Sequence, residues 1–392
     1  MGGPRFPDEG VKLIACDPAQ GVGCETSWRL ELKTIFITGG AGFIGKRLAL
    51  SLRAKGHSVT VLDSLLPQVH SDAEGAVRDL NNAGVATVIG DVRDTDKMAS
   101  IIVKARAEVI VHLAAETGTG QSYDLPVRYC DVNVTGTASV IEAARAAREA
   151  GVLVERMLLA GSRAVYGEGA CLDAEGHAVT AVPRLSKDLA AGDFAPKSAA
   201  GLPLQPMPSR AASTIVAPAS VYASTKLMQE YLFRQTLEQS EIACGILRLQ
   251  NVYGAGQSLY NPYTGVLSIF AQQLLKGGTL NIFEDGEIVR DFVHVSDVVA
   301  AFHQLCEIER VPTMTIDIGS GQRETILDVA KLMISTLGLE GDRLAISGQF
   351  RPGDIRHALA DIADAESLLG WAPKVSLQAG VVELLDWARS TL

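Results

Sequence analysis

The chain has 392 residues with a formal net charge of -10, and 47% of its residues are hydrophobic. This length and apolar content allow a large core and predict one large domain or two unequal ones. The acidic balance argues against nucleic acid and anionic membrane surfaces as partners, because its field would repel phosphate. No run of about 18 apolar residues is present, so no transmembrane helix is expected.

The six cysteines are scattered without a C-x-x-C pair, which indicates neither a disulfide framework nor a zinc ribbon and favours a reduced, cytoplasmic protein. They are Cys16, Cys24, Cys130, Cys171, Cys244 and Cys306. The first 33 residues carry acidic side chains and no sustained apolar segment, so they do not have the pattern of a signal peptide. We expect residues 1–33 to form a poorly specified N-terminal extension.

From residue 33 onward, short β-branched segments alternate with helical patterns. The segments are almost continuously apolar, as in parallel strands that are covered on both faces. Strands are expected at 33–39, 57–63, 85–91, 107–115, 155–162 and 243–249, and helices at 42–56, 72–82, 95–105 and 124–150. The alternation predicts an α/β fold with a doubly wound parallel sheet of the Rossmann type.

The regular pattern defines the expected domains. It covers residues 34–250, with an irregular, proline-rich interruption at about 169–217 that is too long for an ordinary loop. This stretch is predicted to be either a functional insertion or a mobile flap. After residue 250 the regularity weakens, so residues 251–392 are expected to form mainly a smaller C-terminal lobe that binds substrate.

A glycine-rich turn joins the first strand to the first helix. Gly39 permits the tight turn, Gly42 lets the backbone approach a pyrophosphate, and Gly45 lets helix and strand pack closely, with the diphosphate at the helix N-terminus. Asp63 ends the next strand, 24 residues after Gly39. A carboxylate there accepts both ribose hydroxyls and repels a 2′-phosphate, which favours NAD over NADP. The alternative is a glycine turn with an ordinary aspartate.

Asp91, which ends the third strand, is predicted either to reach the adenine or to cap a helix.

A second group of residues has the chemistry of proton transfer. Tyr222 and Lys226 lie four residues apart at a helix start, so their side chains share one face. A lysine ammonium and a positive nicotinamide are expected to lower the pKa of Tyr222 from about 10, so that it exchanges a hydroxyl proton while hydride moves. Tyr-x-x-x-Lys also occurs by chance on helix surfaces. Ser162 ends the fifth strand, at the ligand-binding edge, and its hydroxyl is expected to hydrogen-bond the reacting oxygen.

Several segments together resemble the extended short-chain dehydrogenase/reductase family, the nucleotide-sugar epimerases and dehydratases. They are the glycine turn, "HLAA" at 112–115, Ser162 with "VYG" at 165–167, Tyr222 with Lys226, "RLQNVYG" at 248–254, "VRDFVHVSD" at 289–297 and "RPGDIRH" at 351–357. The resemblance covers about residues 34–390. It implies NAD as cofactor, a nucleotide-diphosphate sugar as substrate, and a homodimer formed by the helices near 124–150 and 221–238.

The resemblance also assigns site residues. For the nucleotide they are Asn251, Arg290, Arg351 and Asp354, and for NAD, besides Gly39, Gly42, Gly45, Asp63, Asp91, Tyr222 and Lys226, they are Phe43, Ile44, Val92, Leu113, Ala114 and Ala115. His112 and His294 are predicted to be packed structural residues rather than catalytic ones.

Departures from the family pattern narrow the expected reaction. Dehydratases of this family carry Asp-Glu directly after the hydroxyl residue, and the decarboxylases keep the glutamate, whereas this chain has Arg163 and Ala164. What remains is oxidation at C4 followed by re-reduction on the opposite face, a 4-epimerase. The alternatives are a nucleotide-sugar 4-ketoreductase or dehydrogenase with exchangeable NAD(H) and, more remotely, a non-catalytic NAD-binding scaffold.

A closer resemblance links segments 114–138, 161–170, 188–196 and 204–208 to dTDP-L-rhamnose 4-epimerase-like enzymes. The expected substrate is therefore dTDP-L-rhamnose with dTDP-6-deoxy-L-talose, or a UDP-hexose. In those enzymes the insertion often carries paired cysteines that suggest a metal site. Here Cys171 and His177 alone cannot complete a four-ligand site, so no metal is expected and packing must order the insertion.

Overall fold

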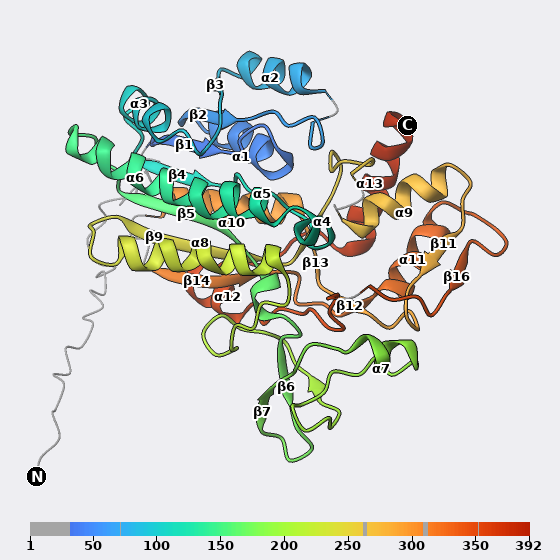
Figure 1. Ribbon diagram of the computed structural model, residues 1–392. Helices are drawn as coiled ribbons and strands as arrows, with labels where there is room; N and C mark the ends of the chain where they lie inside the picture. Colours follow the sequence, from blue (N-terminus) through green and yellow to red (C-terminus); the bar gives the residue numbers. More distant parts are fainter. Residues whose placement is uncertain (1–31, 71, 262–264, 309–312, 352) are drawn as a thin grey trace, which may run out of the picture. The chain divides into compact units, whose positions relative to one another are not determined.

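The computed structural model describes residues 32–392 except residues 71, 262–264, 309–312 and 352 (Figure 1). Residues 1–31 of the expected extension, with Cys16 and Cys24, lie outside the described residues. The other cysteines, Cys130, Cys171, Cys244 and Cys306, are free thiols. In the described part of the chain, no helix combines the length and apolar character needed to cross a bilayer.

Seven parallel strands form the central sheet, in the order β14-β9-β5-β4-β1-β2-β3 (Figure 1). The first strand of the described residues, β1, lies inside the sheet, and later strands are added on both sides of it, which is the doubly wound arrangement. The strands are β1 Thr34–Thr38, β2 Ser58–Asp63, β3 Ala86–Ile89, β4 Val109–His112, β5 Arg156–Ser162, β9 Ala243–Leu249 and β14 Met314–Ile318. The predicted Rossmann-type α/β fold is confirmed.

Helices cover both faces of this sheet. Helices α1 (Phe43–Ala54), α2 (Ala73–Asn82), α10 (Val295–Glu307) and α12 (Ala363–Leu369) contribute to one apolar layer, and α3 (Thr95–Ala105), α6 (Gly136–Glu149) and α8 (Val221–Leu237) to the other. Successive residues of β1 point to opposite layers: Ile35 and Ile37 join the first and Phe36 the second. Because both faces are covered, the inner strands are apolar at almost every position.

Two predicted elements differ from the structure. The third strand was expected to be covered on both faces, but β3 is an edge strand, and Ala86 and Ile89 at its ends are exposed. The helix expected at 124–150 is divided into α4 (Thr119–Asp124), α5 (Pro126–Tyr129), a π-helical turn (Cys130–Thr135) and α6. Pro126 starts a new helix because a proline ring fits only the first turn.

Much of the chain after residue 250 forms a separate layer with its own core. Three two-stranded sheets pair β10 (Asn251–Tyr253) with β13 (Phe292–His294), β11 (Leu280–Ile282) with β16 (Leu344–Ile346) and β12 (Val289–Arg290) with β15 (Glu324–Thr325). Helices α9 (Val266–Leu275), α11 (Ile326–Thr336) and α13 (Leu377–Thr391) pack around buried residues such as Phe270 and Met333. The chain also returns to the main sheet through α10, β14 and α12, so these three elements belong to the Rossmann layers.

The insertion has its own small structure (Figure 1). Strands β7 (Ala178–Thr180), β6 (Ala170–Leu172) and β8 (Gln205–Pro206) form an antiparallel sheet in that order, and α7 (Ser186–Ala190) follows β7 along the chain. Cys171, Leu189 and Leu204 are buried. The Lys197 ammonium lies 2.9 Å from Asp188 and 2.7 Å from Asp193. Packing and local ion pairs therefore hold the insertion together.

Candidate active site

A cavity of about 1220 Å³ lies where several strands of the central sheet end. Its lining includes residues at the carboxyl ends of β1, β2, β4, β5 and β9, or directly after them, together with the start of α8. The predicted site residues that line it are Gly39, Gly42, Phe43, Ile44, Gly45, Asp63, Asp91, Val92, Leu113, Ala114, Ala115, Ser162, Tyr222, Lys226 and Asn251. The fold therefore brings the predicted cofactor and catalytic residues to one cavity at the edge where open α/β sheets bind ligands.

The glycine turn leaves no space for side chains on its inner side. Gly39 has a φ of +69°, and a Cβ added there would lie 2.7 Å from the Ala114 nitrogen. A Cβ on Gly45 would lie 2.2 Å from the Gly39 carbonyl oxygen. Gly42 precedes α1 and offers no side-chain cap, so the first-turn N–H groups of this helix can meet an anion. The tight glycine turn and the free N–H groups at the start of α1 are suited to binding the pyrophosphate of NAD.

Asp63 supports this turn as well as facing the cavity. Its Oδ2 accepts a hydrogen bond from the Ala41 N–H, and its Oδ1 accepts one from the Leu65 N–H, both at 2.9 Å. His70 Nε2 lies 3.3 Å from Oδ1. Burial alone would raise the pKa of Asp63, but these three partners outweigh it and hold the pKa below its usual value. The contact with His70 and the bracing of the turn were not predicted.

Replacing Asp63 with asparagine should therefore weaken NAD binding by about tenfold and reduce the preference for NAD over NADP. It should also lower the free energy of unfolding by about 1–3 kcal/mol near pH 7, because an amide replaces a charged acceptor. The folded pKa is depressed, so the stabilisation is present above about pH 4 and is lost as the pH falls through the folded value. Cofactor titrations and chemical unfolding at pH 7 and pH 3 measure these effects. An unchanged preference for NAD over NADP would contradict the assignment of Asp63 to the ribose hydroxyls.

The structure tests one of the two roles predicted for Asp91, that of a helix cap. It accepts hydrogen bonds from the Arg93 N–H at 2.9 Å and from the Arg93 guanidinium at 2.7 Å. The cap of α3 is Asp94, whose carboxylate accepts from the Lys97 N–H at 3.1 Å. The prediction that Asp91 caps a helix is therefore wrong, and Asp91 remains a residue of the cavity wall.

Three side chains with proton-transfer chemistry meet beside the cofactor turn. Ser162 ends β5, and Tyr222 and Lys226 occupy the first turns of α8, whose N-terminus is capped by Ser220. The Ser162 hydroxyl accepts from the Ala164 N–H at 3.2 Å, and it lies close enough to the Tyr222 phenol to lower the pKa of that group. The hydroxyls of Ser162 and Tyr222 are thus placed to share one substrate oxygen.

In the protein chain alone, burial dominates the pKa values of this group. Burial raises the pKa of Tyr222, although the Ser162 hydroxyl opposes the rise. Lowering it was predicted from Lys226 and the nicotinamide, so the protein chain alone does not produce that shift. Burial also lowers the pKa of Lys226 to about 8, against the charge of Glu230 one turn further along α8. Glu230 is itself held by Arg248 at 2.7 Å.

We therefore expect the buried Lys226 ammonium to lower the free energy of unfolding, although it contributes to the proposed reaction. After cofactor removal, Lys226→Met is expected to raise the free energy of unfolding at pH 7 by about 1 kcal/mol or more, because a buried ammonium is removed. The folded pKa of about 8 lies below the unfolded value, so the penalty is full below pH 8 and fades as the pH rises toward about 10.4. Chemical unfolding of both proteins at pH 7 and pH 10 measures this. A variant equally destabilised at both pH values would contradict it.

One supporting residue has no equivalent in the sequence predictions. Asn133 lies in the π-helical turn, where its Oδ1 accepts from the Glu116 N–H at 2.7 Å and its Nδ2 donates to Thr225 Oγ1 at 2.9 Å. Thr225 donates in turn to the Tyr222 carbonyl at 2.8 Å. Asn133 thus ties a cavity-lining loop to the helix that carries Tyr222. An asparagine among several polar residues of a helical pattern gave no signal of this role.

The two histidines of the family motifs are packed, as predicted. His112 lies 2.7 Å from Thr38 Oγ1 and 2.9 Å from Thr137 Oγ1. Burial, followed by the charge of Lys226, lowers the pKa of His112 to about 3. His294 caps α10. Neither arrangement requires a catalytic role.

The residues predicted for the nucleotide are placed differently from one another. Asn251 lines the cavity, whereas Arg290, Arg351 and Asp354 are not part of its described lining. Arg290 donates to Asp354 at 2.7 Å. Arg351 is exposed, with its guanidinium carbon 4.8 Å from the centre of the Phe283 ring. The structure therefore brings Arg290 and Asp354 together and leaves Arg351 at the surface.

The known proteins that this chain resembles include two 4-epimerases of nucleotide sugars and a protein solved with a nucleotide sugar and NAD. The chain is 39% identical over 360 residues to the dTDP-L-rhamnose 4-epimerase of Burkholderia thailandensis, covering 92% of this chain and 96% of that protein. It resembles the crystal structure of Thermotoga maritima UDP-glucose 4-epimerase with UDP-glucose at a TM-score of 0.72 and 28% identity, covering 91% and 99% of the two chains. It also resembles MoeE5 in complex with UDP-glucuronic acid and NAD, at a TM-score of 0.68, 27% identity and coverage of 91% and 99%.

The family match covers the Rossmann region and includes the main residues that line the cavity. A family model described as the NAD dependent epimerase/dehydratase family matches residues 35–319. This range includes the glycine turn, Asp63, Ser162, Tyr222 and Lys226, all of which line the cavity. The chain belongs to the NAD dependent epimerase/dehydratase family.

Proposed function

We propose that this chain is a nucleotide-sugar 4-epimerase that retains one NAD through successive turnovers. Its substrates are dTDP-L-rhamnose and dTDP-6-deoxy-L-talose, or a UDP-hexose. The observation that carries the proposal is the meeting of Ser162, Tyr222 and Lys226 at the cavity without a carboxylate directly after Ser162. Arg163 is buried there and donates to the Gly167 carbonyl at 3.0 Å, and Ala164 has only a methyl group. The acid and base expected for dehydration are therefore missing from those positions.

Each residue of the group has one task in this reaction. NAD, when bound, would supply the acceptor and then the donor of the C4 hydride, and the sugar would have to turn over between the two steps to present its opposite face. Tyr222 removes the proton from O4 during oxidation and returns it during reduction. Ser162 orients O4 through its hydroxyl, and the Lys226 ammonium stabilises the Tyr222 phenolate. Because the same tyrosine takes and returns the proton, no further acid or base is required.

Relatives support the choice of nucleotide sugar. The identity of 39% to a dTDP-L-rhamnose 4-epimerase favours a dTDP-6-deoxy sugar, and the solved relatives with UDP-sugars keep a UDP-hexose open. We assign Asn251 and the pair of Arg290 and Asp354 to the nucleotide end, because arginine forks suit a diphosphate and an acidic protein must supply positive charge locally.

A panel of sugars tests the function. Purified protein without added cofactor is incubated with dTDP-L-rhamnose, UDP-glucose or UDP-N-acetylglucosamine, and the products are followed by NMR. We expect a C4-inverted sugar at many turnovers per protein. Conversion only with stoichiometric NAD or NADH would instead indicate a ketoreductase or dehydrogenase. Bound NAD without conversion of any sugar in a broad panel would favour the scaffold alternative.

The assembly and cellular setting are part of the proposal. We infer a homodimer through the α5 and α8 surfaces, since Val127, Met228 and Tyr231 are exposed there. Sedimentation analysis tests the assembly, and a monomer at micromolar concentration would contradict it. The free thiols among the described residues suit the reducing cytoplasm.

A further inference from the structure

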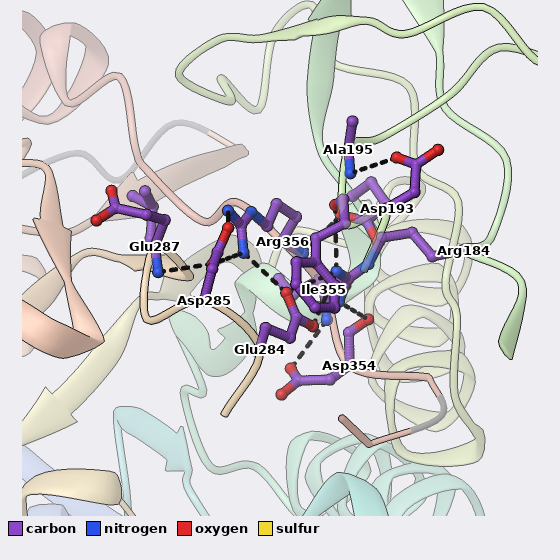
Figure 2. Close-up of polar contacts among 12 residues, drawn as sticks. Arg184, Asp193, Ala195, Glu284, Asp285, Glu287, Asp354, Ile355 and Arg356 are labelled. Carbon is purple, nitrogen blue, oxygen red and sulfur yellow. Dashed lines mark hydrogen bonds and ion pairs between the residues drawn. The ribbon is translucent and has the colours of Figure 1, made fainter. Parts of the chain in front are cut away.

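A buried arginine of the insertion joins three segments of the chain. Arg184 follows β7, and its side chain is only 2% exposed. Its guanidinium lies 3.0 Å from Glu168 and 2.9 Å from Glu284, and it donates to the Asp354 carbonyl at 3.0 Å. Figure 2 shows Arg184 beside Glu284 and Asp354. One side chain therefore connects the insertion with the segment after β5, the β11–β12 turn and the chain near residue 354.

The same two glutamates also hold the next arginine. Glu168 Oε2 accepts from the Arg356 N–H at 2.8 Å, and Glu284 Oε2 accepts from the Arg356 guanidinium at 2.8 Å. The Asp285 carboxylate accepts from both terminal nitrogens of that guanidinium, at 2.7 Å and 2.8 Å (Figure 2). The main chain from Asp354 to Arg356 is thus fixed at both ends by contacts that depend on Arg184 and its partners.

This fixed segment carries half of the pair assigned to the nucleotide. Asp354 Oδ1 accepts from Arg290 Nη2 at 2.7 Å, and Arg290 Nη1 donates to the Ile355 carbonyl at 3.0 Å. Moving the main chain at Asp354 would therefore move the carboxylate and the guanidinium together. Among the described residues, Arg184 donates hydrogen bonds to Glu168, Phe194, Glu284 and Asp354, and none of these lines the cavity.

Because these charged side chains are buried, each of them must remain paired. Glu168 and Glu284 are 6% and 1% exposed. Burial raises the pKa of Glu168, and the charge of Arg184 opposes that rise. Buried ion pairs of this kind add little net stability but penalise any arrangement that leaves a charge unpaired. The cluster is therefore suited to holding one geometry.

We propose that Arg184 is a positioning residue for the nucleotide: it fixes the Asp354 main chain, and through it the pair of Arg290 and Asp354, so that the insertion determines affinity for the nucleoside diphosphate. This inference rests on the proposed function for the identity of the ligand. Arg184 takes no part in the chemistry at C4, which belongs to Ser162, Tyr222 and Lys226.

The variant Arg184→Lys tests the proposal, because it keeps the charge and removes the planar fork of donors. Calorimetry with dTDP and with UDP measures nucleotide affinity in the NAD-containing enzyme. We expect Kd for the nucleotide that binds the wild type, and KM for its sugar, to rise about tenfold, which is about 1.4 kcal/mol. Kcat should stay within about twofold and the NAD content should not change.

Lys197→Met is the matched control. Lys197 pairs with Asp188 and Asp193, all within the insertion, so the control weakens the insertion without touching residues 354–356. Its Kd and KM should match the wild type. If Arg184→Lys does not fold, the double variant Arg184→Gln with Glu284→Gln replaces it, since it removes the two charges of the Arg184–Glu284 ion pair together.

Three results would overturn the proposal: a fall in kcat with unchanged Kd and KM, a lower unfolding temperature with unchanged Kd and KM, or equal loss of affinity in the Lys197 control. Failure of the proposed function gives a different result. A wild type that binds dTDP or UDP but inverts no sugar would refute the epimerase, while the Kd comparison would still decide the role of Arg184. A wild type that binds neither nucleotide would refute both.

Discussion

Replacing Tyr222 with phenylalanine is expected to lower kcat for epimerisation by about 10²–10⁴-fold, the usual contribution of a positioned general base or acid. The change removes one hydroxyl, from a side chain that lines the cavity together with Ser162 and the cofactor turn. The ring remains, so the packing of α8 and the NAD content should be preserved. Steady-state kinetics together with the absorbance of bound cofactor measure the two effects separately.

A tyrosine elsewhere on the same helix provides the control. Tyr231 is exposed on α8, and Tyr231→Phe should retain wild-type kcat and cofactor content. If Tyr222→Phe kept more than about a tenth of the wild-type kcat, Tyr222 would not be the group that moves the O4 proton. Loss of bound NAD in Tyr222→Phe would instead indicate a role in cofactor binding.

Replacing Gly45 with alanine is expected to abolish the retention of NAD during purification. The added Cβ would lie 2.2 Å from the Gly39 carbonyl oxygen and 2.8 Å from the Gly40 Cα, so the turn must move. Overpacking of this kind typically lowers the free energy of unfolding by about 1–3 kcal/mol. The displaced turn can no longer present its backbone to the pyrophosphate. Cofactor release on denaturation, measured by absorbance, quantifies the loss.

A second change in α1 separates stability from binding. Ala54 is exposed in the last turn of the helix, and Ala54→Gly should cost about 1 kcal/mol through helix propensity alone. This control should keep its NAD. If Gly45→Ala retained the cofactor, or if both variants lost it equally, close packing in the turn would not explain NAD binding.

Sequence patterns predicted those parts of the site that depend on local geometry. The glycine turn was predictable because glycine adopts a φ of +69° at residue 39 without strain and lacks the Cβ that the contact at residue 45 excludes. The edge position of Ser162 followed from the rule that parallel strands present their carboxyl ends to ligands. The shared face of Tyr222 and Lys226 followed from helical spacing. Their catalytic roles stay predictions until the variants are measured.

Other features depend on contacts between distant segments. Arg184 and Glu284 are 100 residues apart, and no periodicity connects an insertion loop with a turn of the C-terminal lobe. The π-helical turn that presents Asn133 was hidden in what appeared to be one long helix. The raised pKa of Tyr222 follows from burial, which spacing along a helix does not reveal. Each of these features depends on the tertiary arrangement around the site.

The most direct test of the central claim follows the hydrogen on C4. A nucleotide sugar deuterated at C4, dTDP-L-rhamnose first, is incubated with the purified protein in ordinary water without added cofactor, and the product is analysed by NMR and mass spectrometry. The proposed oxidation and re-reduction within one bound complex predicts a C4-inverted sugar that still carries deuterium at C4. Inversion with replacement of deuterium by solvent hydrogen would contradict it.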